Sequence, residues 1–308
     1  MKRRDLLQLS ATLGLAASLP RSALSEPHAD RDATLPKIRG RAMPNQLQPP
    51  AGGAIPVAFL LSENAVVIDF SGPWEVFENV QVPGPMPHPF QLYTVAETTA
   101  PIRASGGMII VPNYSLASAP PPKIIVIPAQ SDPSDAVIAW VRNATKTTDV
   151  TMSVCTGVFL LAKTGLLSGK TATTHHGAYR ELAMAFPDIL VERGARFVES
   201  GNLASSGGLS SGIDLALHVV ERYFGHAVAL STADNLEYQG LGWMNPDSNQ
   251  AYAKARVSTD QRPLCPVCEM DVDVSTAPKA IYRGRTYYFC MESHKQLFDK
   301  SPDQFVGA

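Results

Sequence analysis

Residues 150–162, VTMSVCTGVFLLA, pass from an apolar run directly into a helix-forming run, with Cys155 at the join. An apolar run of this length suits a strand that is buried on both faces of a parallel sheet. A residue at such a strand-to-helix turn lies at the carboxyl edge of the sheet, where ligands bind in open α/β folds. This one stretch therefore predicts the fold class and supplies the first candidate for chemistry.

Further apolar runs alternate with helical patterns on either side of this stretch. We expect strands over residues 55–61, 90–96, 108–111, 123–128 and 150–154. We expect helices over residues 73–79, 135–143, 156–164, 177–186, 211–224 and 227–239. Strands and helices in alternation predict an α/β fold, with a mostly parallel sheet that helices cover on both sides.

The position of Cys155 suits a nucleophile. The dipole and the free N–H groups at the start of the following helix favour a thiolate, and the same N–H groups can bind an oxyanion. The alternative is that Cys155 is a small buried apolar residue, as most free cysteines are. Position alone leaves both interpretations open.

Composition narrows the classes of partner. The 308 residues carry a formal net charge of -2, and no run rich in Lys and Arg occurs beyond the N-terminus. A nucleic-acid partner is therefore not expected. No later apolar run approaches the length of a membrane helix, so we expect no membrane span in the mature protein.

The N-terminus reads as a targeting segment. A positive head at residues 2–4 precedes a mostly apolar stretch over 6–19, and the small residues Ala23 and Ser25 mark a cleavage site. The pair Arg3-Arg4 resembles a twin-arginine export signal, which implies a periplasmic protein. The alternative is an ordinary Sec signal with a chance arginine pair.

Polar stretches divide the chain. We expect a signal peptide over 1–25, a flexible linker over 26–54, an α/β domain over 55–244, a second linker over 245–262 and a small domain over 263–308.

Four blocks carry a resemblance to a known superfamily. They are DFSGPWEVF at 69–77, SVCTGVFLLA at 153–162, ATTHH at 172–176 and SGGLSSGID at 206–214. In this order and spacing they resemble the ThiJ/PfpI superfamily, related to class I glutamine amidotransferases, and within it the isonitrile hydratase branch. The resemblance implies a flavodoxin-like three-layer sandwich. It also implies a small-molecule substrate, no cofactor for this domain, and a homodimer.

The resemblance implies roles for four residues. Cys155 matches the nucleophile, and Asp69 matches the acidic residue that faces it in hydratase-like members. Thr156 follows the nucleophile, so that its N–H serves the oxyanion hole and its hydroxyl holds a water. His175 matches a family histidine that either orients the site or caps a turn. For Asp69 the alternative is a turn residue before Gly72.

The implied reaction suits these residue types. A thiolate adds to the isonitrile carbon to give a thioimidate, which water converts to an N-substituted formamide while one carboxyl group moves the protons. Two departures from the family limit the resemblance. Thr156 stands where many relatives have His or Gly, which argues against a Cys-His dyad and a peptidase. Ala129-Gln130 replaces a glycine pair, which leaves the second oxyanion donor open.

Two other polar residues receive structural roles. We expect His218 to pack within the helix over 211–224, and Glu75 to support the helix start at Pro73.

Three cysteines gather near the C-terminus. Cys265 and Cys268 form a C-x-x-C pair, and Cys290 and His294 lie one helical turn apart. Two such short pairs supply the four ligands of a tetrahedral metal site. The alternatives are a disulfide or a small domain without metal.

The stretch from 263 to 306 resembles a YHS domain, most specifically in YRGRTYYFC at 282–290. Such domains are associated with heavy-metal handling. Cys265 stands where an acidic residue is common, and His294 stands where the last cysteine is common. This mixed sulfur and nitrogen set suits zinc or copper. Met270 adds a thioether or packs in the core.

Three functions fit these features. The first is an exported, cysteine-dependent hydratase, a lyase, with an accessory metal-binding domain. The second is a glyoxalase or deglycase on the same fold, and the third is a non-catalytic metal-binding or metal-stress protein. A transcription regulator is not expected, because the C-terminal part has no helix-turn-helix pattern and the chain carries an export signal.

Overall fold

The structure is a computed structural model, and it describes residues 46–306. The expected signal peptide lies outside these residues, as does most of the linker expected over 26–54. Near the end of that linker, Leu47 packs on the core and donates its N–H to the Arg222 carbonyl at 2.9 Å. None of the helices in the described part combines the length and apolar character that a membrane span requires.

A seven-stranded sheet forms the centre of the α/β domain. Its strand order is β10-β11-β7-β6-β1-β2-β5, and every pairing within it is parallel except β10 with β11. The expected mostly parallel sheet is confirmed. The strands are β1 (Ile55–Leu60), β2 (Phe90–Ala96), β5 (Tyr114–Ser115), β6 (Ile124–Ile127), β7 (Val150–Val154), β10 (Phe197–Ser200) and β11 (Leu203–Ser206).

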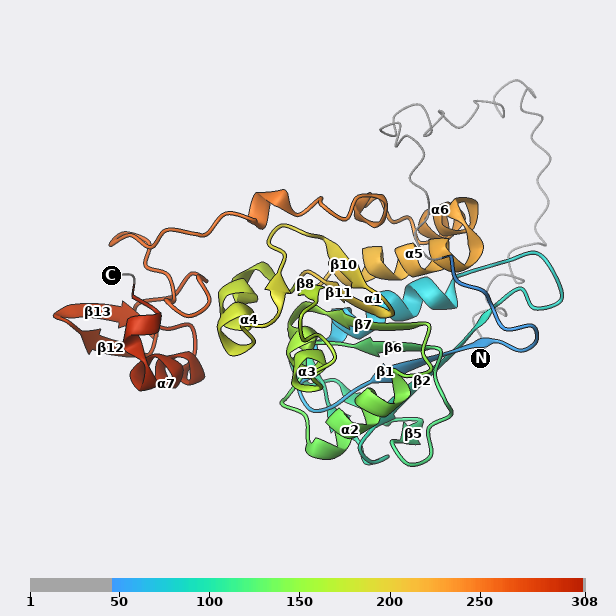
Figure 1. The fold of residues 1–308 in the computed structure, drawn as a ribbon, viewed down its shortest axis with the longest axis horizontal. Helices are drawn as coiled ribbons and strands as arrows, with labels where there is room; N and C mark the ends of the chain where they lie inside the picture. Colours follow the sequence, from blue (N-terminus) through green and yellow to red (C-terminus); the bar gives the residue numbers. More distant parts are fainter. Residues whose placement is uncertain (1–45, 307–308) are drawn as a thin grey trace, which may run out of the picture. The chain divides into compact units, whose positions relative to one another are not determined.

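Helices cover both faces of this sheet (Figure 1). Alternate residues of β1 point to opposite faces, so Phe59 joins one apolar cluster and Leu60 joins the other. The first cluster lies beneath α1 (Val67–Glu78), α5 (Ser211–Phe224) and α6 (His226–Asn235). The second lies beneath α2 (Asp135–Ala144) and α3 (Val158–Lys163). The three-layer arrangement is the one that the alternating pattern predicts.

Several elements differ from the expectation. Helix α1 begins at Val67 rather than at residue 73, so Pro73 lies inside it, and α6 ends at Asn235 rather than at 239. The run over 108–111 forms only β4 (Ile109–Ile110), which pairs with β3 (Ile102–Arg103) outside the main sheet.

Strands β10 and β11 belong to the main sheet and have no counterpart in the expected elements. Strand β11 is LASS, and its Ser205 and Ser206 are almost fully buried. Their hydroxyls are satisfied, because Ser205 Oγ accepts from Thr173 N–H at 2.9 Å and Ser206 Oγ donates to the Ser153 carbonyl at 3.4 Å. Small polar residues therefore occupy a buried strand that hydropathy cannot reveal.

The region after β7 completes the α/β domain. It contains α4 (Tyr179–Ala185), together with the short strands β8 (Thr171–Ala172) and β9 (Leu190–Val191).

The segment over 245–262, expected to be a linker, contacts the α/β domain along part of its length. The Pro246 carbonyl accepts from Arg196 N–H, the Tyr252 ring stacks on His176 at 4.7 Å, and the Ala253 carbonyl accepts from Arg193 Nε at 2.9 Å. These contacts hold the segment to the domain surface.

The small C-terminal domain consists of a hairpin and a helix. Strands β12 (Lys279–Tyr282) and β13 (Arg285–Tyr288) pair antiparallel, and α7 (Glu292–Lys300) follows. Its buried core is compact and includes two of the three cysteines. The core residues are Cys265, Val267, Cys268, Phe289, Phe298 and Phe305.

The turn after β7 depends on Gly157. A Cβ at this position would lie 2.3 Å from the Ile127 carbonyl oxygen and 2.7 Å from that of Pro128. We therefore predict that Gly157→Ala lowers the free energy of unfolding by about 2–4 kcal/mol, because backbone atoms of β6 must move. Urea denaturation measures this loss. Gly52→Ala is the matched control, because no atom of residues 46–306 lies within 4 Å of its Cβ position. Equal stability of the two variants would contradict the prediction.

Candidate functional site

Cys155 occupies a constrained turn at the carboxyl end of β7. Its φ is 58°, in the left-handed region that residues other than glycine seldom adopt. Its N–H donates to the Gly207 carbonyl at 3.1 Å, and its own carbonyl accepts from the Thr174 hydroxyl at 3.0 Å. A 3-10 turn over Cys155–Gly157 then leads into α3. Such a strained, doubly anchored residue is typical of functional sites.

The sulfur of Cys155 is held by groups from two turns. The N–H groups of Thr156 and Leu209 and the Thr156 hydroxyl form hydrogen bonds with it. Burial is the largest influence on its pKa, followed by the Asp69 carboxylate, and together they raise the pKa of Cys155 to about 12 despite these hydrogen bonds. The N–H group at the helix start lowers the pKa of Cys155, as expected, but burial outweighs it. The resting sulfur is a thiol.

Leu209 also contributes to the site, through a backbone group that its residue type does not reveal. It lies in the block over 206–214 and has a φ of 52°. This conformation turns the backbone so that its N–H reaches the sulfur. The two glycines at 207 and 208 were the available signal of an unusual turn.

Asp69 lies in the first turn of α1 and is fully buried. It is not a loop residue before Gly72, so that alternative is wrong. Its Oδ2 accepts from the Ala129 N–H at 3.1 Å, whereas Oδ1 has no hydrogen-bond partner among the described residues. Burial raises the pKa of Asp69 to about 7, against the lowering effect of the Ala129 hydrogen bond. A buried carboxyl oxygen without a partner is available to a thiol, a water or a substrate.

Two donors of the pair Ala129-Gln130 are engaged away from the sulfur. The Ala129 N–H is engaged by Asp69, and Gln130 Nε2 donates to the Leu60 carbonyl at 3.1 Å. Gln130 instead lines a cavity with the carboxylates of Glu63, Glu97 and Asp132.

Neither Cys155 nor Asp69 lines that cavity. Cys155 is 8% exposed, and no hydrogen bond joins it to Asp69 in the part of the chain that the structure describes. The Asp69 carboxylate nevertheless lies close enough to the sulfur to raise the pKa of Cys155, and little of the Cys155 side chain is exposed.

His175 caps a turn. Its Nδ1 accepts from the Gly177 N–H at 3.1 Å, and a Cβ at Gly208 would lie 2.2 Å from its Cδ2. Burial, and then the neighbouring His176, lower the pKa of His175. The capping role is confirmed, and a part in catalysis stays a prediction.

Two further residues lie away from the sulfur. His218 is buried in α5, packs on Phe197 and contacts Glu199 Oε2 through Nε2 at 2.9 Å. Glu75 is exposed on α1 and contacts the side chain of Asn79. It lies within the helix and does not support its start.

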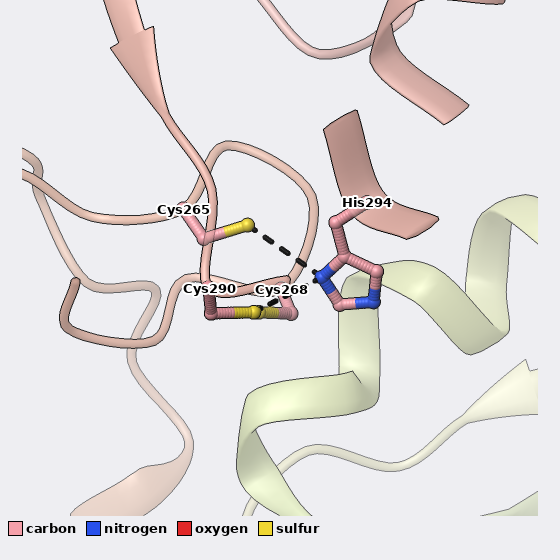
Figure 2. A group of neighbouring side chains, drawn as sticks. All are labelled: Cys265, Cys268, Cys290 and His294. Atoms are coloured by element: carbon pink, nitrogen blue, oxygen red, sulfur yellow. Dashed lines mark hydrogen bonds between the residues drawn. The ribbon is translucent and has the colours of Figure 1, made fainter. Parts of the chain in front are cut away.

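The four C-terminal candidates converge on one point (Figure 2). The three sulfurs and an imidazole nitrogen all lie within 4.8 Å of one another. Cys268 Sγ lies 3.5 Å from Cys290 Sγ, and His294 Nδ1 lies 3.2 Å from Cys290 Sγ and 3.6 Å from Cys265 Sγ. The structure brings together the four side chains that the sequence predicts as ligands, and their binding of a metal stays a prediction.

These distances distinguish a metal site from a disulfide. A disulfide requires sulfurs about 2.0 Å apart, and the cysteines here are free. Ligands at about 2.0–2.3 Å from a tetrahedral zinc ion lie about 3.3–3.8 Å from each other. The three contact distances of 3.2, 3.5 and 3.6 Å lie in or close to this range.

The ionisation of the cluster also suits a cation. Hydrogen bonds from Cys268 and then Cys290 hold the pKa of Cys265 far below its usual range, and contact with Cys265 raises the pKa of Cys268. Burial lowers the pKa of His294, but its contacts with Cys265, Cys290 and Glu181 raise it to about 12. The buried sulfurs share protons that a cation would replace.

The raised pKa of Asp69 predicts how stability varies with pH. In the unfolded chain, Asp69 releases its proton at the ordinary carboxyl pKa of 3.8, whereas the folded protein keeps that proton to higher pH. Stability is therefore present below that value and is lost as pH rises through about 7. Asparagine does not ionise, so Asp69→Asn lacks this loss. We predict that the free energy of unfolding of Asp69→Asn, minus that of the parent, increases by about 2 kcal/mol between pH 5 and pH 8.

Guanidinium denaturation at the two pH values measures this difference. The exposed Asp260→Asn serves as the control and should show no such growth. A constant difference between Asp69→Asn and the parent would contradict a raised pKa.

Two family models match the chain. The model described as the DJ-1/PfpI family matches residues 56–222, and the model described as the YHS domain matches residues 265–308.

The chain is also similar in sequence to individual proteins. Isonitrile hydratase of Pseudomonas putida is 26% identical over 227 residues, which cover 72% of this chain and 95% of that protein. The transcriptional regulator CdhR of Pseudomonas aeruginosa is 24% identical over 174 residues, which cover 55% of this chain and 50% of that one.

Solved structures agree in fold. A ThiJ/PfpI family protein from Pseudomonas syringae superposes with a TM-score of 0.55 at 25% identity, over 70% of this chain and 84% of that chain. Drosophila melanogaster DJ-1beta superposes with a TM-score of 0.51 at 19% identity, over 61% of this chain and all of that one (100%), and shows the fold alone. The chain belongs to the DJ-1/PfpI family and ends in a YHS domain.

Proposed function

We propose that the protein is a cysteine-dependent hydratase that converts isonitriles to N-substituted formamides. The observation that carries this proposal is the buried Asp69 carboxyl group beside Cys155, with a pKa of about 7 and one oxygen without a hydrogen-bond partner among the described residues. The relative isonitrile hydratase, matched over 95% of its length, supports the choice of substrate class.

The first half of the reaction forms a carbon–sulfur bond. Asp69 accepts the Cys155 thiol proton, the sulfur bonds to the isonitrile carbon, and the proton passes to that carbon to give an N-substituted thioimidate. A thiol with a pKa of about 12 needs such a base, and a carboxyl group with a pKa of about 7 is available in its basic form at neutral pH. The Thr156 and Leu209 donors hold the sulfur in place.

The second half restores the enzyme. Water adds to the thioimidate carbon and the nitrogen gains a proton, with Asp69 relaying the proton that water loses. The carbon–sulfur bond then breaks, the formamide leaves, and the sulfur recovers its proton. One isonitrile and one water give one formamide, with no redox step.

The C-terminal domain supplies a separate function. We propose that Cys265, Cys268, Cys290 and His294 bind one zinc or copper ion in the mature, periplasmic protein. The sulfur-rich set and the separations in the cluster support either metal. The site takes no part in the isonitrile chemistry.

A non-catalytic metal-binding protein is the second candidate. The low exposure of Cys155 and the absence of a hydrogen bond between it and Asp69 in the described residues favour that candidate. Substrate entry requires this site to open.

An activity screen against isonitriles and α-oxoaldehydes distinguishes these functions. We predict turnover of isonitriles, its abolition in Cys155→Ala, and a fall of about 10²–10⁴-fold in Asp69→Asn. Because Asp69 must be ionised, kcat/KM should fall as pH drops below about 7.

Glu75→Gln is the matched control, since this exposed carboxylate lies on the same helix. It should keep the parent rate. Turnover of α-oxoaldehydes alone would replace the proposed reaction, and no turnover of either class would favour the metal-binding protein.

A further inference from the structure

The two ring nitrogens of His294 face different parts of the chain. Nδ1 faces the sulfurs of Cys290 and Cys265, at 3.2 and 3.6 Å. Nε2 lies 3.3 Å from Oε2 of Glu181. Glu181 does not belong to the C-terminal domain, because it lies in the first turn of α4 in the α/β domain.

This arrangement has a known chemical meaning. A histidine that binds a metal through one nitrogen donates the N–H of its other nitrogen, often to a carboxylate, which fixes the tautomer and the ring orientation. The His294 side chain is 8% exposed and that of Glu181 is 28% exposed, so the contact is partly shielded from solvent. When a cation takes the place of the proton on Nδ1, the remaining proton stays on Nε2, which faces Glu181.

We infer that Glu181 is the positioning residue of the C-terminal metal site, so that metal binding and docking of the C-terminal domain on α4 stabilise each other. The inference rests on the proposed metal site. It adds that three cysteines and a histidine do not complete that site, since its outer carboxylate comes from the α/β domain.

Contacts on either side of Glu181 hold α4 against the C-terminal domain. Met184 packs on the apolar core of that domain, and the Arg180 guanidinium lies 5.8 Å from the centre of the Phe305 ring. Because these residues flank Glu181 on α4, they hold its carboxylate near His294.

A second group of contacts extends the same interface. Arg193 forms an ion pair with Glu269 at 3.1 Å, and both side chains are largely shielded from solvent. Met270 lies over Gly177, where a Cβ would come within 2.8 Å of its Cγ. Neither contact involves a metal ligand, so the interface has a basis that is independent of the ion.

Reciprocity follows from thermodynamic linkage. If docking improves the orientation of His294 and so strengthens metal binding, then metal binding must strengthen docking by the same factor. A change in metal affinity and a change in the mobility of α4 should therefore accompany each other.

Zinc titration of the full-length, metal-free protein against a chromophoric chelator tests whether Glu181 strengthens metal binding. We expect Glu181→Ala to weaken zinc binding by about 10–100-fold, and Glu181→Gln, which keeps an acceptor oxygen, to lie between it and the parent. Glu292→Gln is the control, because it removes an exposed carboxylate from α7 and should stay within about threefold of the parent.

Cobalt substitution tests whether the role is one of positioning. The thiolate-to-cobalt absorption band should persist in Glu181→Ala, since all four ligands remain. Loss of that band would mean that Glu181 maintains the ligand set itself, which would contradict the inference.

Hydrogen–deuterium exchange of the full chain tests the linkage. Zinc should slow exchange over residues 179–185 in the parent and have less effect in Glu181→Ala. Zinc affinity in Glu181→Ala equal to that of the parent, or exchange over 179–185 that zinc leaves unchanged, would overturn the inference. A parent that binds no zinc or copper would instead overturn the metal site itself, so the two failures are distinguishable.

Discussion

The close approach of the β7–α3 turn to β6 is the constraint on which the α/β site depends. Gly157 lies where any side chain would meet the Ile127 and Pro128 carbonyl groups. This contact, together with the hydrogen bonds of Cys155 to Gly207 and Thr174, keeps Cys155 at a φ of 58°. The strained conformation holds the sulfur at the carboxyl edge of the sheet, and the packing of the strands provides the free energy that maintains it.

Burial gives the site its electrostatic character. It raises the pKa of Cys155 to about 12 and that of Asp69 to about 7, so a thiol and a half-ionised carboxyl group lie side by side at neutral pH. An exposed pair would instead hold a fully ionised carboxylate, which is a weaker base. In the C-terminal cluster the neighbouring sulfurs control ionisation instead, because the pKa of Cys265 is lowered and that of Cys268 is raised. A bound cation would take the place of the proton that Cys268 keeps.

The sequence predicted those features that depend on hydrophobic runs and on the spacing of nearby residues. Strands β2 and β7 and helix α5 have the bounds that their hydrophobic runs predict, and the spacing of the C-x-x-C and C-x-x-x-H pairs predicts the four metal ligands. Strand β11 was missed because its buried serines are satisfied by distant partners. Leu209 contributes a backbone N–H, which its residue type does not reveal, although the glycines at 207 and 208 signal an unusual turn. The contact between Glu181 and His294 joins two domains and leaves no signal in spacing.

The central claim is that the Cys155 sulfur bonds to the isonitrile carbon, and the most direct test is to trap that bond. The full-length protein would be mixed with an isonitrile, reduced with borohydride to fix the thioimidate, digested and examined by peptide mass spectrometry. The account predicts an adduct of one isonitrile on the peptide that contains Cys155, and none on Cys265, Cys268 or Cys290 of the metal-loaded protein. Turnover of the isonitrile with Cys155 unmodified at every quench time would contradict it.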